Sequence, residues 1–194
     1  MKRNTITLQF TFNGILILNN NKLNEYDLND CVDKYKVINS QIFIKKIKNI
    51  LDELKINQHL LTDNIDIIID KTYNQIDKDI LERTFKDLSF NKIKFLNITD
   101  KLLTCNTDAM VSVHQKALKI FYLNEVIYID TYFNKYKEII EILLKELNTK
   151  YNIKTIKLYG DNKIIDEILK LYEKNKKVQL YKFSYPNQIP INLL

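Results

Sequence analysis

Glycine and proline are scarce in this chain of 194 residues, which contains two of each. Loops that cradle phosphate with backbone N–H groups usually contain several glycines, because a side chain would block the close approach. No Walker A, G-x-G-x-x-G or G-x-S-x-G pattern occurs. The composition therefore nearly excludes a glycine-rich catalytic loop.

Cysteine is equally rare: Cys31 and Cys105 are far apart and form no C-x-x-C pair. This spacing predicts buried or free thiols in a reducing compartment rather than a disulfide framework. No apolar run approaches the 18 residues of a membrane span. The N-terminal MKRNTITLQF alternates polar and apolar residues, whereas a signal peptide has a continuous apolar stretch. These features predict a cytoplasmic protein without a direct membrane span.

Arginine is nearly absent although the net charge is +6, and Arg3 and Arg83 are the only two. A positive charge is compatible with binding to nucleic acid, but readers of phosphates and bases favour the planar guanidinium of arginine. The lysines are interleaved with Asp and Glu, which is typical of a solvated surface. Nucleic-acid binding is therefore the less favoured interpretation of the charge.

Hydrophobic periodicity divides the first half into strands and helices. Strand 5–12 alternates and is joined by Asn13-Gly14 to a second strand, as in a hairpin. The Asn- and Asp-rich stretch 19–34 is interpreted as a loop, and 35–38 as a short third strand. Asn39-Ser40 offers an N-cap for a helix over 41–54, and Asp77 for a helix to Leu88. Two further strands are expected at 64–70 and 92–98.

The second half repeats this β-β-β-α-β-α-β order. Strands are expected at 110–115, 117–123, 125–133, 153–159 and 178–183, and helices at 135–148 and 162–174. The repeat predicts an α/β fold made of two tandem RNase H-like units with mixed sheets. The predicted boundaries are 1–100 and 101–185 for the two units, followed by an extended C-terminal tail at 186–194.

Few residues offer chemistry. Asp66 and Asp70 are four apart on one strand face and could in principle hold Mg²⁺, but two solvated residues at the strand ends are the favoured interpretation. His59 and His114 lack ligand-spaced partners. Cys105 with His114 lacks a third orienting group for nucleophilic catalysis. No catalytic, cofactor-binding or metal-ligating residue is therefore assigned.

The aromatic residues could form a surface for single-stranded nucleic acid. Many lie at periodic inward positions and are expected in the core, namely Phe43, Phe85, Phe95 and Phe121. Four tyrosines near the 109–133 meander and the following helix remain as candidate surface aromatics: Tyr122, Tyr128, Tyr132 and Tyr136.

The doubled unit resembles the actin-like ATPase superfamily, and more closely its PilM-type members and the cytoplasmic domain of GspL. Segment 63–103 resembles the strand, helix and strand of the family's first half. SVHQKALKIFYLNEVIYIDTYF resembles its second phosphate-binding hairpin, and IKTIKLYGDNKIIDEILKLY its adenosine-motif strand, turn and helix. The loop at 19–34 is too short for the extra subdomain of PilM-like proteins, so the resemblance implies a trimmed version.

The chain departs from the family where nucleotide would bind. In the first hairpin Gln9 or Thr11 stands in place of the family's Asp, and Gly14 alone remains of its glycines. In the second hairpin Ser112 and His114 occupy the acidic region, and no glycine follows. The adenosine turn reads Tyr159-Gly160-Asp161-Asn162 instead of a glycine-rich sequence.

The resemblance therefore implies a non-catalytic scaffold without a cofactor, on the cytoplasmic face of a bacterial inner membrane. As in PilM-like proteins, it would bind the cytoplasmic tail of a bitopic, PilN-like membrane protein. It would serve a pilus, type II secretion, DNA-uptake or motor-associated machine and could assemble into a ring or chain. Two alternatives remain: an RNase H-like nucleic-acid-binding protein, and a degenerate nucleotide-binding phosphotransferase.

Overall fold

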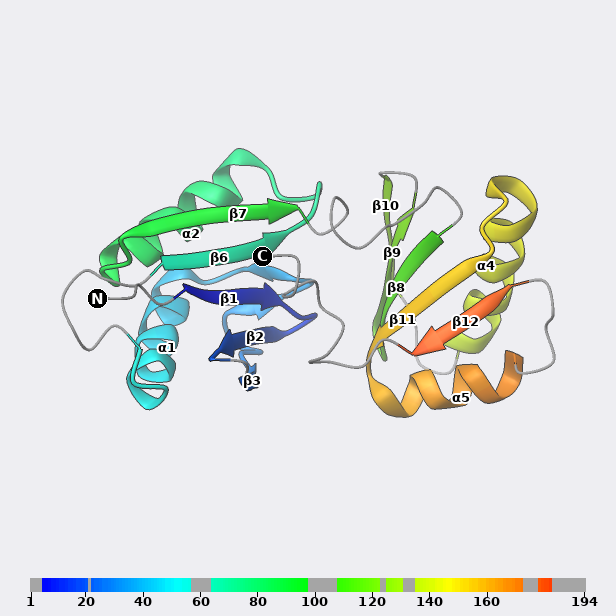
Figure 1. The fold of residues 1–194 in the computed structure, drawn as a ribbon, viewed down its shortest axis with the longest axis horizontal. Coiled ribbons are helices and arrows are strands. Elements are labelled where there is room, and N and C mark those ends of the chain that lie inside the picture. Colours follow the sequence, from blue (N-terminus) through cyan, green and yellow to red (C-terminus); the bar gives the residue numbers. More distant parts are fainter. Residues whose placement is uncertain are drawn as a thin grey trace. The chain divides into compact units, whose positions relative to one another are not determined.

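The computed structural model describes residues 5–20, 22–56, 64–97, 108–122, 125–130, 135–172 and 178–182. The chain divides into two compact units, Met1–Ile98 and Thr99–Leu194. Each unit contains one mixed five-stranded sheet and two helices among its described residues (Figure 1). The predicted α/β class with mixed sheets is confirmed. The predicted tail at 186–194 lies outside the described residues.

The sheet of the first unit has the order β3-β2-β1-β6-β7. β1 pairs antiparallel with β2 and parallel with β6, and β6 pairs parallel with β7. A separate two-stranded ribbon, β4–β5, precedes the first helix. The elements are β1 (Thr5–Phe10), β2 (Gly14–Asn19), β3 (Lys22–Asp27), β4 (Val32–Asp33), β5 (Lys36–Val37), α1 (Ser40–Glu53), β6 (Asn64–Ile69), α2 (Gln75–Asp87) and β7 (Lys92–Asn97).

The second sheet has the corresponding order, β10-β9-β8-β11-β12. β8 pairs antiparallel with β9 and parallel with β11, so the pattern of directions matches that of the first sheet. The elements are β8 (Asp108–His114), β9 (Ala117–Tyr122), β10 (Glu125–Asp130), α4 (Tyr136–Tyr151), β11 (Thr155–Gly160), α5 (Asn162–Tyr172) and β12 (Gln179–Lys182). No helix within the described ranges is both long and apolar enough to cross a membrane.

Two strand predictions for the first unit are wrong. The third strand of the sheet is β3, which lies inside the stretch 19–34 that was predicted as a loop. β3 is an edge strand with exposed charged residues, so its sequence KLNEYD shows no apolar alternation. The predicted third strand at 35–38 is the short β5 of the separate ribbon.

The N-cap of α2 is Asn74 and not the predicted Asp77. The Asn74 side chain accepts a hydrogen bond from the Asp77 N–H, and the Asp77 carboxylate accepts one from the Asn74 N–H. This reciprocal capping box starts the helix one turn earlier than predicted. For α1 the predicted cap is confirmed, because Asn39 accepts a hydrogen bond from the Ile42 N–H.

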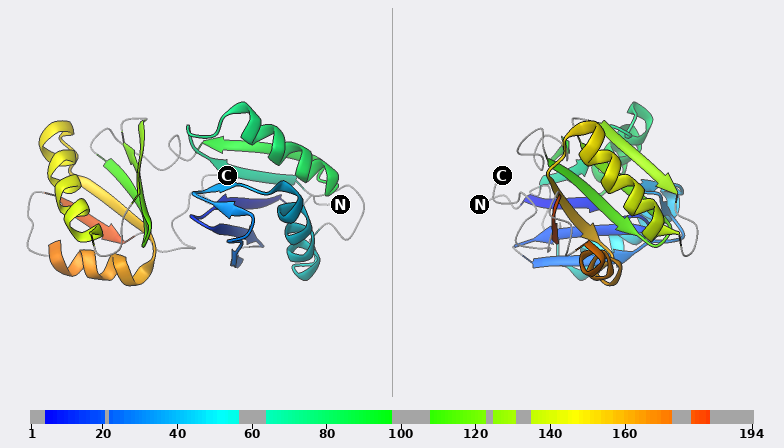
Figure 2. Two further views of the ribbon diagram at one scale, coloured as in Figure 1. Left: turned by 180° about the vertical axis from the view of Figure 1, so that it is seen from behind. Right: turned by 90° about the vertical axis from the view of Figure 1, so that its right-hand side faces the viewer.

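Each unit buries one sheet face under its helices. In the first, the Phe10 ring stacks on Phe43 of α1 with 5.8 Å between centroids. In the second, β8, β9 and β11 share one core cluster with α4 and α5, and Figure 2 shows both helices on the same face of the sheet. Predicted core residues Phe43, Phe85 and Phe121 are buried, whereas Phe95 is half-buried.

Candidate functional site

The carboxyl ends of parallel strands are the usual ligand-binding edge of an open α/β sheet. Each unit has one such edge. The first edge consists of the β1–β2 turn with Gly14 and of residues 70–74 after β6. The second edge consists of the β8–β9 turn and of Gly160 to Asn162 after β11. These segments include the three positions that the sequence resemblance assigns to a nucleotide.

The β1–β2 turn on the first edge is closed by its own contacts. The Thr11 N–H donates to the Gly14 carbonyl at 2.9 Å, and the Phe12 carbonyl accepts the Tyr35 N–H at 3.1 Å. The Phe12 ring is buried and meets the Tyr35 ring edge-on, with 5.8 Å between centroids. Apolar packing therefore fills the turn that the sequence resemblance assigns to phosphate binding.

The pairing of β2 with β3 requires a glycine at position 14. A Cβ at this position would lie 2.1 Å from the backbone oxygen of Tyr26 on β3, far inside van der Waals contact. The absence of a side chain thus lets β2 and β3 approach one another. The sequence analysis identified Gly14 as the one glycine remaining from a phosphate-binding loop. In the structure this glycine has a structural role in the sheet.

Beyond the end of β6, the chain folds back on Asp70. The Asp70 Oδ1 accepts hydrogen bonds from the Thr72 N–H at 2.8 Å and from the Thr72 hydroxyl at 2.5 Å. Asp70 is only 8% exposed, and so is Asp66 in the middle of β6. The prediction that both are solvated is wrong. Along an extended strand their backbones are about 13 Å apart, too far to share one metal ion.

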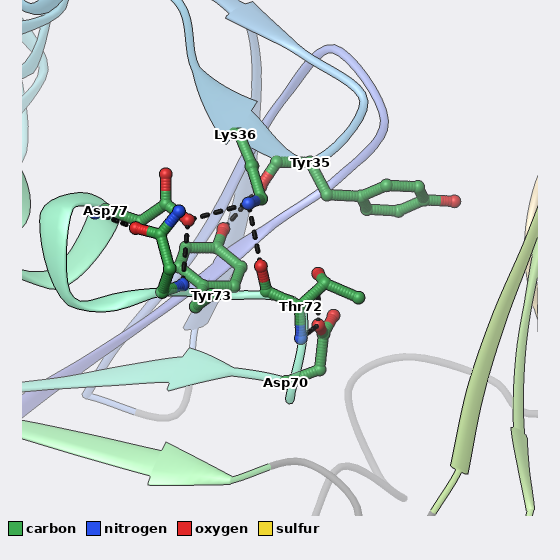
Figure 3. A network of polar contacts seen from close by, with 7 residues as sticks. Tyr35, Lys36, Asp70, Thr72, Tyr73 and Asp77 are labelled. Carbon is green, nitrogen blue, oxygen red and sulfur yellow. Dashed lines mark hydrogen bonds and ion pairs between the residues drawn. The ribbon is translucent and has the colours of Figure 1, made fainter.

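Lys36 on β5 links the ribbon to the start of α2 (Figure 3). Its Nζ donates to the Thr72 carbonyl at 2.7 Å and to the Asp77 Oδ2 at 2.6 Å. The same ammonium lies 5.5 Å from the centroid of the Tyr73 ring. A lysine with these acceptors is fully engaged in holding two loops together.

Tyr73 forms the buried centre of this network. Its hydroxyl donates to the Tyr35 carbonyl, which ties the turn after β6 to the same ribbon. Burial raises the pKa of Tyr73 well above its usual value, and the negative charges of Asp70 and Asp77 raise it further. Tyr73 therefore stays protonated near neutral pH and acts as a hydrogen-bond donor. We call Lys36, Thr72, Tyr73 and Asp77 the Lys36 network.

On the second edge, His114 ends β8 and is half-buried. Its Nδ1 accepts a hydrogen bond from the Lys116 N–H at 3.2 Å. Burial lowers the pKa of His114, and Lys116 lowers it further, whereas the negative charge of Asp161 opposes the shift. The imidazole is therefore neutral at pH 7.

A buried lysine lies in the same sheet, one strand from Ser112. The register places Lys119 opposite Ser112 on one side and Tyr128 on the other, and Tyr159 opposite Ser112. Lys119 is 2% exposed, and its Nζ lies 6.0 Å from the centroid of the Phe121 ring. The row across four strands thus holds one cation and three hydroxyls, and it includes Ser112, where the sequence resemblance leads us to expect an acidic residue.

The turn after β11, which the sequence resemblance assigns to adenosine, is occupied by the chain's own groups. Gly160 has a φ of +115°, and a Cβ there would lie 2.3 Å from the Val113 carbonyl oxygen. That oxygen accepts the Asp161 N–H at 2.9 Å. The Asp161 carboxylate in turn accepts the N–H groups of Lys163 at 3.0 Å and Ile164 at 3.3 Å. The positive end of α5 is thereby occupied by the chain's own carboxylate.

Several candidate residues from the sequence analysis do not belong to either edge. His59, Cys105 and Tyr132 are outside the described residues, as is the Tyr136 side chain. The prediction that Tyr122 is a surface aromatic is wrong, because its side chain is 5% exposed. Its ring packs against that of Tyr151 with 4.7 Å between centroids. Within the described ranges, no three His, Cys, Asp or Glu side chains gather as metal ligands would.

The Lys36 network was not predicted. Its signal in the sequence is the N-x-x-D capping box at Asn74 and Asp77, which reveals the start of α2 but not its partner. Lys36 and Asp77 are 41 residues apart, and no periodicity connects them. The capping role of Asp161 could have been predicted from the sequence, because this Asp directly precedes the helix predicted at 162–174.

No protein-family model matches the chain, and no curated protein matches its sequence. The fold, however, matches solved structures. The MamK double helical filament has a TM-score of 0.60 at 8% identity, with 95% of both chains covered. EutJ from Carboxydothermus hydrogenoformans also scores 0.60 at 8% identity, covering 93% of this chain and 84% of EutJ.

MreB 5 of Spiroplasma citri bound to AMPPNP scores 0.59 at 8% identity, over 94% of this chain and 92% of MreB 5. These three proteins share the actin fold, and the match spans both units of the present chain. At this identity the similarity establishes the architecture. The resemblance predicted from the sequence is confirmed at that level: the chain has the fold of the actin-like ATPase superfamily.

Proposed function

We propose that this protein is a non-catalytic, actin-like scaffold built from two tandem RNase H-like units. It binds the cytoplasmic tail of a membrane protein at the cytoplasmic face of a bacterial inner membrane. The observation that carries the proposal is that the chain's own groups occupy the first and third nucleotide positions, while Ser112 and His114 stand in the acidic region of the second. The fold is kept while the nucleotide-binding chemistry is replaced, as a binding role permits.

Each of the three positions lacks a different feature that nucleotide binding requires. Phe12 packing occupies the first hairpin, and Gln9 or Thr11 stands in place of the family's acidic residue. The second hairpin has Ser112 and a neutral His114, with the buried Lys119 alongside. The N-terminus of α5, where an anion would be favoured, is capped by Asp161. A Mg²⁺–nucleotide complex would meet an Asp161 carboxylate already bonded to the first N–H groups of α5, and Ser112 and His114 in the acidic region of the second hairpin.

The identity of the partner rests on the resemblance to PilM-type proteins and the GspL cytoplasmic domain. In that setting the partner is a PilN-like membrane protein with a short cytoplasmic tail, and the machine is a pilus, secretion, DNA-uptake or motor-associated assembly. Self-assembly into rings or chains is part of the proposal, because a solved structure with this fold is a filament of MamK. No bond is made or broken in this role.

An affinity pull-down of the tagged full chain from detergent-solubilised membrane fractions tests the proposal. We expect co-purification of a protein with one membrane span and a short cytoplasmic tail, resistant to nuclease treatment. A salt titration of binding to unspecific DNA is the control. Recovery of nucleic acid alone, with binding that weakens steeply with salt, would favour the nucleic-acid alternative and reject the scaffold.

A further inference from the structure

Two tyrosine rings from different elements lie in contact in the second unit. Tyr122 is the last residue of β9, and Tyr151 is the last residue of α4. Their ring centroids are 4.7 Å apart, and the ring planes are inclined by 55°. Tyr122 belongs to the core cluster of this unit, and Tyr151 packs against that cluster. Both rings are therefore held in contact by the fold itself.

The two hydroxyls are also hydrogen-bonded to one another. Burial, and then the hydrogen bond that Tyr122 donates to Tyr151, raises the pKa of Tyr122 to about 12. The hydrogen bond accepted from Tyr122, and then one from Lys150, lowers the pKa of Tyr151. The Lys150 ammonium also lies 5.3 Å from the centroid of the Tyr151 ring. Tyr151 thus has the more readily ionised phenol of the two.

The two rings differ in their access to solvent. Tyr122 is 5% exposed, whereas Tyr151 is half-buried at the end of its helix. A soluble oxidant therefore reaches Tyr151 and not Tyr122. A phenolate gives up an electron more readily than a phenol, which again makes Tyr151 the first ring to be oxidised. Because the rings are in contact, the oxidised Tyr151 can take an electron from Tyr122 and then be oxidised a second time.

We propose that Tyr122 and Tyr151 form an oxidative modification site, where hydrogen peroxide activated by a peroxidase joins the two rings as an intramolecular dityrosine. Each phenol gives up one electron and its hydroxyl proton, and the two phenoxyl radicals form a carbon–carbon bond between ring positions ortho to the oxygens. The hydrogens on those two carbons then move to the oxygens, which restores both phenols. One molecule of hydrogen peroxide takes up the two electrons and two protons and leaves as two molecules of water.

Contact within one fold favours this reaction over coupling between molecules. Two rings that are held together react without the entropy loss of bringing two molecules together. The product closes residues 122–151 into a covalent loop and ties β9 to the end of α4. A cross-link of this kind restricts the unfolded chain, so it should raise the stability of the second unit. The modification does not depend on the scaffold function proposed above.

The test treats the full-length protein with a peroxidase and an equimolar amount of hydrogen peroxide. Dityrosine is detected by its blue fluorescence in the monomer fraction and is located by mass spectrometry of proteolytic peptides. We expect a linked peptide pair that contains Tyr122 and Tyr151 and is lighter by two hydrogen atoms than the separate peptides. The cross-linked monomer should also unfold at a higher temperature. A monomer without dityrosine, or with dityrosine at other tyrosines only, would overturn the proposal.

The variant Tyr151→Phe removes the phenol but keeps a ring, and Tyr181→Phe is the matched control at a 52% exposed tyrosine on β12. We expect Tyr151→Phe to lower the dityrosine yield of the monomer at least about tenfold, and Tyr181→Phe to leave the yield unchanged. Tyr122→Phe should behave like Tyr151→Phe. Thermal unfolding before oxidation checks each fold, and the peptide map of the wild-type protein stands without the variants. Equal yields in folded Tyr151→Phe and wild type would reject the site.

Discussion

The Lys36 ammonium lies 2.6 Å from the Asp77 carboxylate, although 41 residues separate them in the sequence. This ion pair joins the β4–β5 ribbon to the first turn of α2. Asp77 also completes the capping box with Asn74, so one carboxylate serves both the helix start and the ribbon. The ribbon and the start of α2 at the first edge are thus held together by the chain's own side chains.

Replacing Lys36 by Met should destabilise the first unit by about 1–2 kcal/mol, since a charged donor with two acceptors is lost. The matched control is Lys46→Met. Lys46 pairs with Asp30 at the same 2.6 Å, but both side chains are more exposed, so the loss should be smaller. Urea unfolding measures both. An equal or smaller loss for Lys36→Met would contradict the role of the network.

Gly160→Ala should destabilise the second unit by at least about 2 kcal/mol, because a positive φ and a clash with backbone act together. The Cβ would stand 2.3 Å from the Val113 carbonyl oxygen, which cannot move without breaking the β8–β11 pairing. Gly14→Ala should also be destabilising, through Tyr26. Thermal unfolding provides the measurement. Unchanged stability of both variants would mean that the sheet does not require these glycines.

The pKa of His114 should fall further in Asp161→Asn, since the Asp161 charge favours the imidazolium. Asparagine keeps a capping oxygen, so α5 should remain intact. Because the folded pKa lies below the unfolded value of about 6.5, His114 contributes a penalty that appears as the pH falls through about 6.5. NMR titration of the His114 ring gives the pKa. A rise in Asp161→Asn would show that the two side chains do not interact as described.

Cys31 should react slowly with thiol reagents in the native protein. It is fully buried, and burial first, then the charge of Asp30, raises the pKa of its thiol to about 11. The reaction can be followed with Ellman's reagent at pH 8 in a Cys105→Ser background, which leaves Cys31 as the reporter. Rapid labelling without denaturant would contradict its burial.

The same pKa predicts a pH dependence of stability. The thiol of the unfolded chain ionises near pH 9, whereas the folded one holds its proton to about pH 11. The contribution of Cys31 is therefore complete below pH 9 and is lost as the pH rises from 9 to 11. The difference in unfolding free energy between the Cys105→Ser protein and its Cys31→Ala derivative isolates this effect.

Alternating apolar residues and helical periodicity were enough to predict most elements of the two sheets. β3 was not predicted, because this edge strand buries few side chains and its sequence KLNEYD resembles that of a polar loop. The α1 cap at Asn39 was readable because its hydrogen bond is local, whereas α2 begins one turn before its predicted cap. Local signals thus predicted the bounds of the other helices and sheet strands to within about a turn.

The site depended on contacts that local signals do not contain. The sequence marks Gly14 and Gly160 as candidate remnants of phosphate loops. Only the strand register shows that each faces a carbonyl of a neighbouring strand. In the same way, Asp70 reads as a solvated carboxylate at a strand end until the chain is seen to fold Thr72 back onto it. Such roles come from pairs of residues that meet only in three dimensions.

Calorimetric titration of the full-length protein with ATP and Mg²⁺ tests most directly the proposal that this chain does not bind nucleotide. MreB 5 of Spiroplasma citri, which has this fold and has been solved with AMPPNP, is the positive control. We predict no saturable heat for the present protein up to millimolar ATP under conditions in which MreB 5 binds. Saturable binding with a micromolar Kd would contradict this proposal and favour the phosphotransferase alternative.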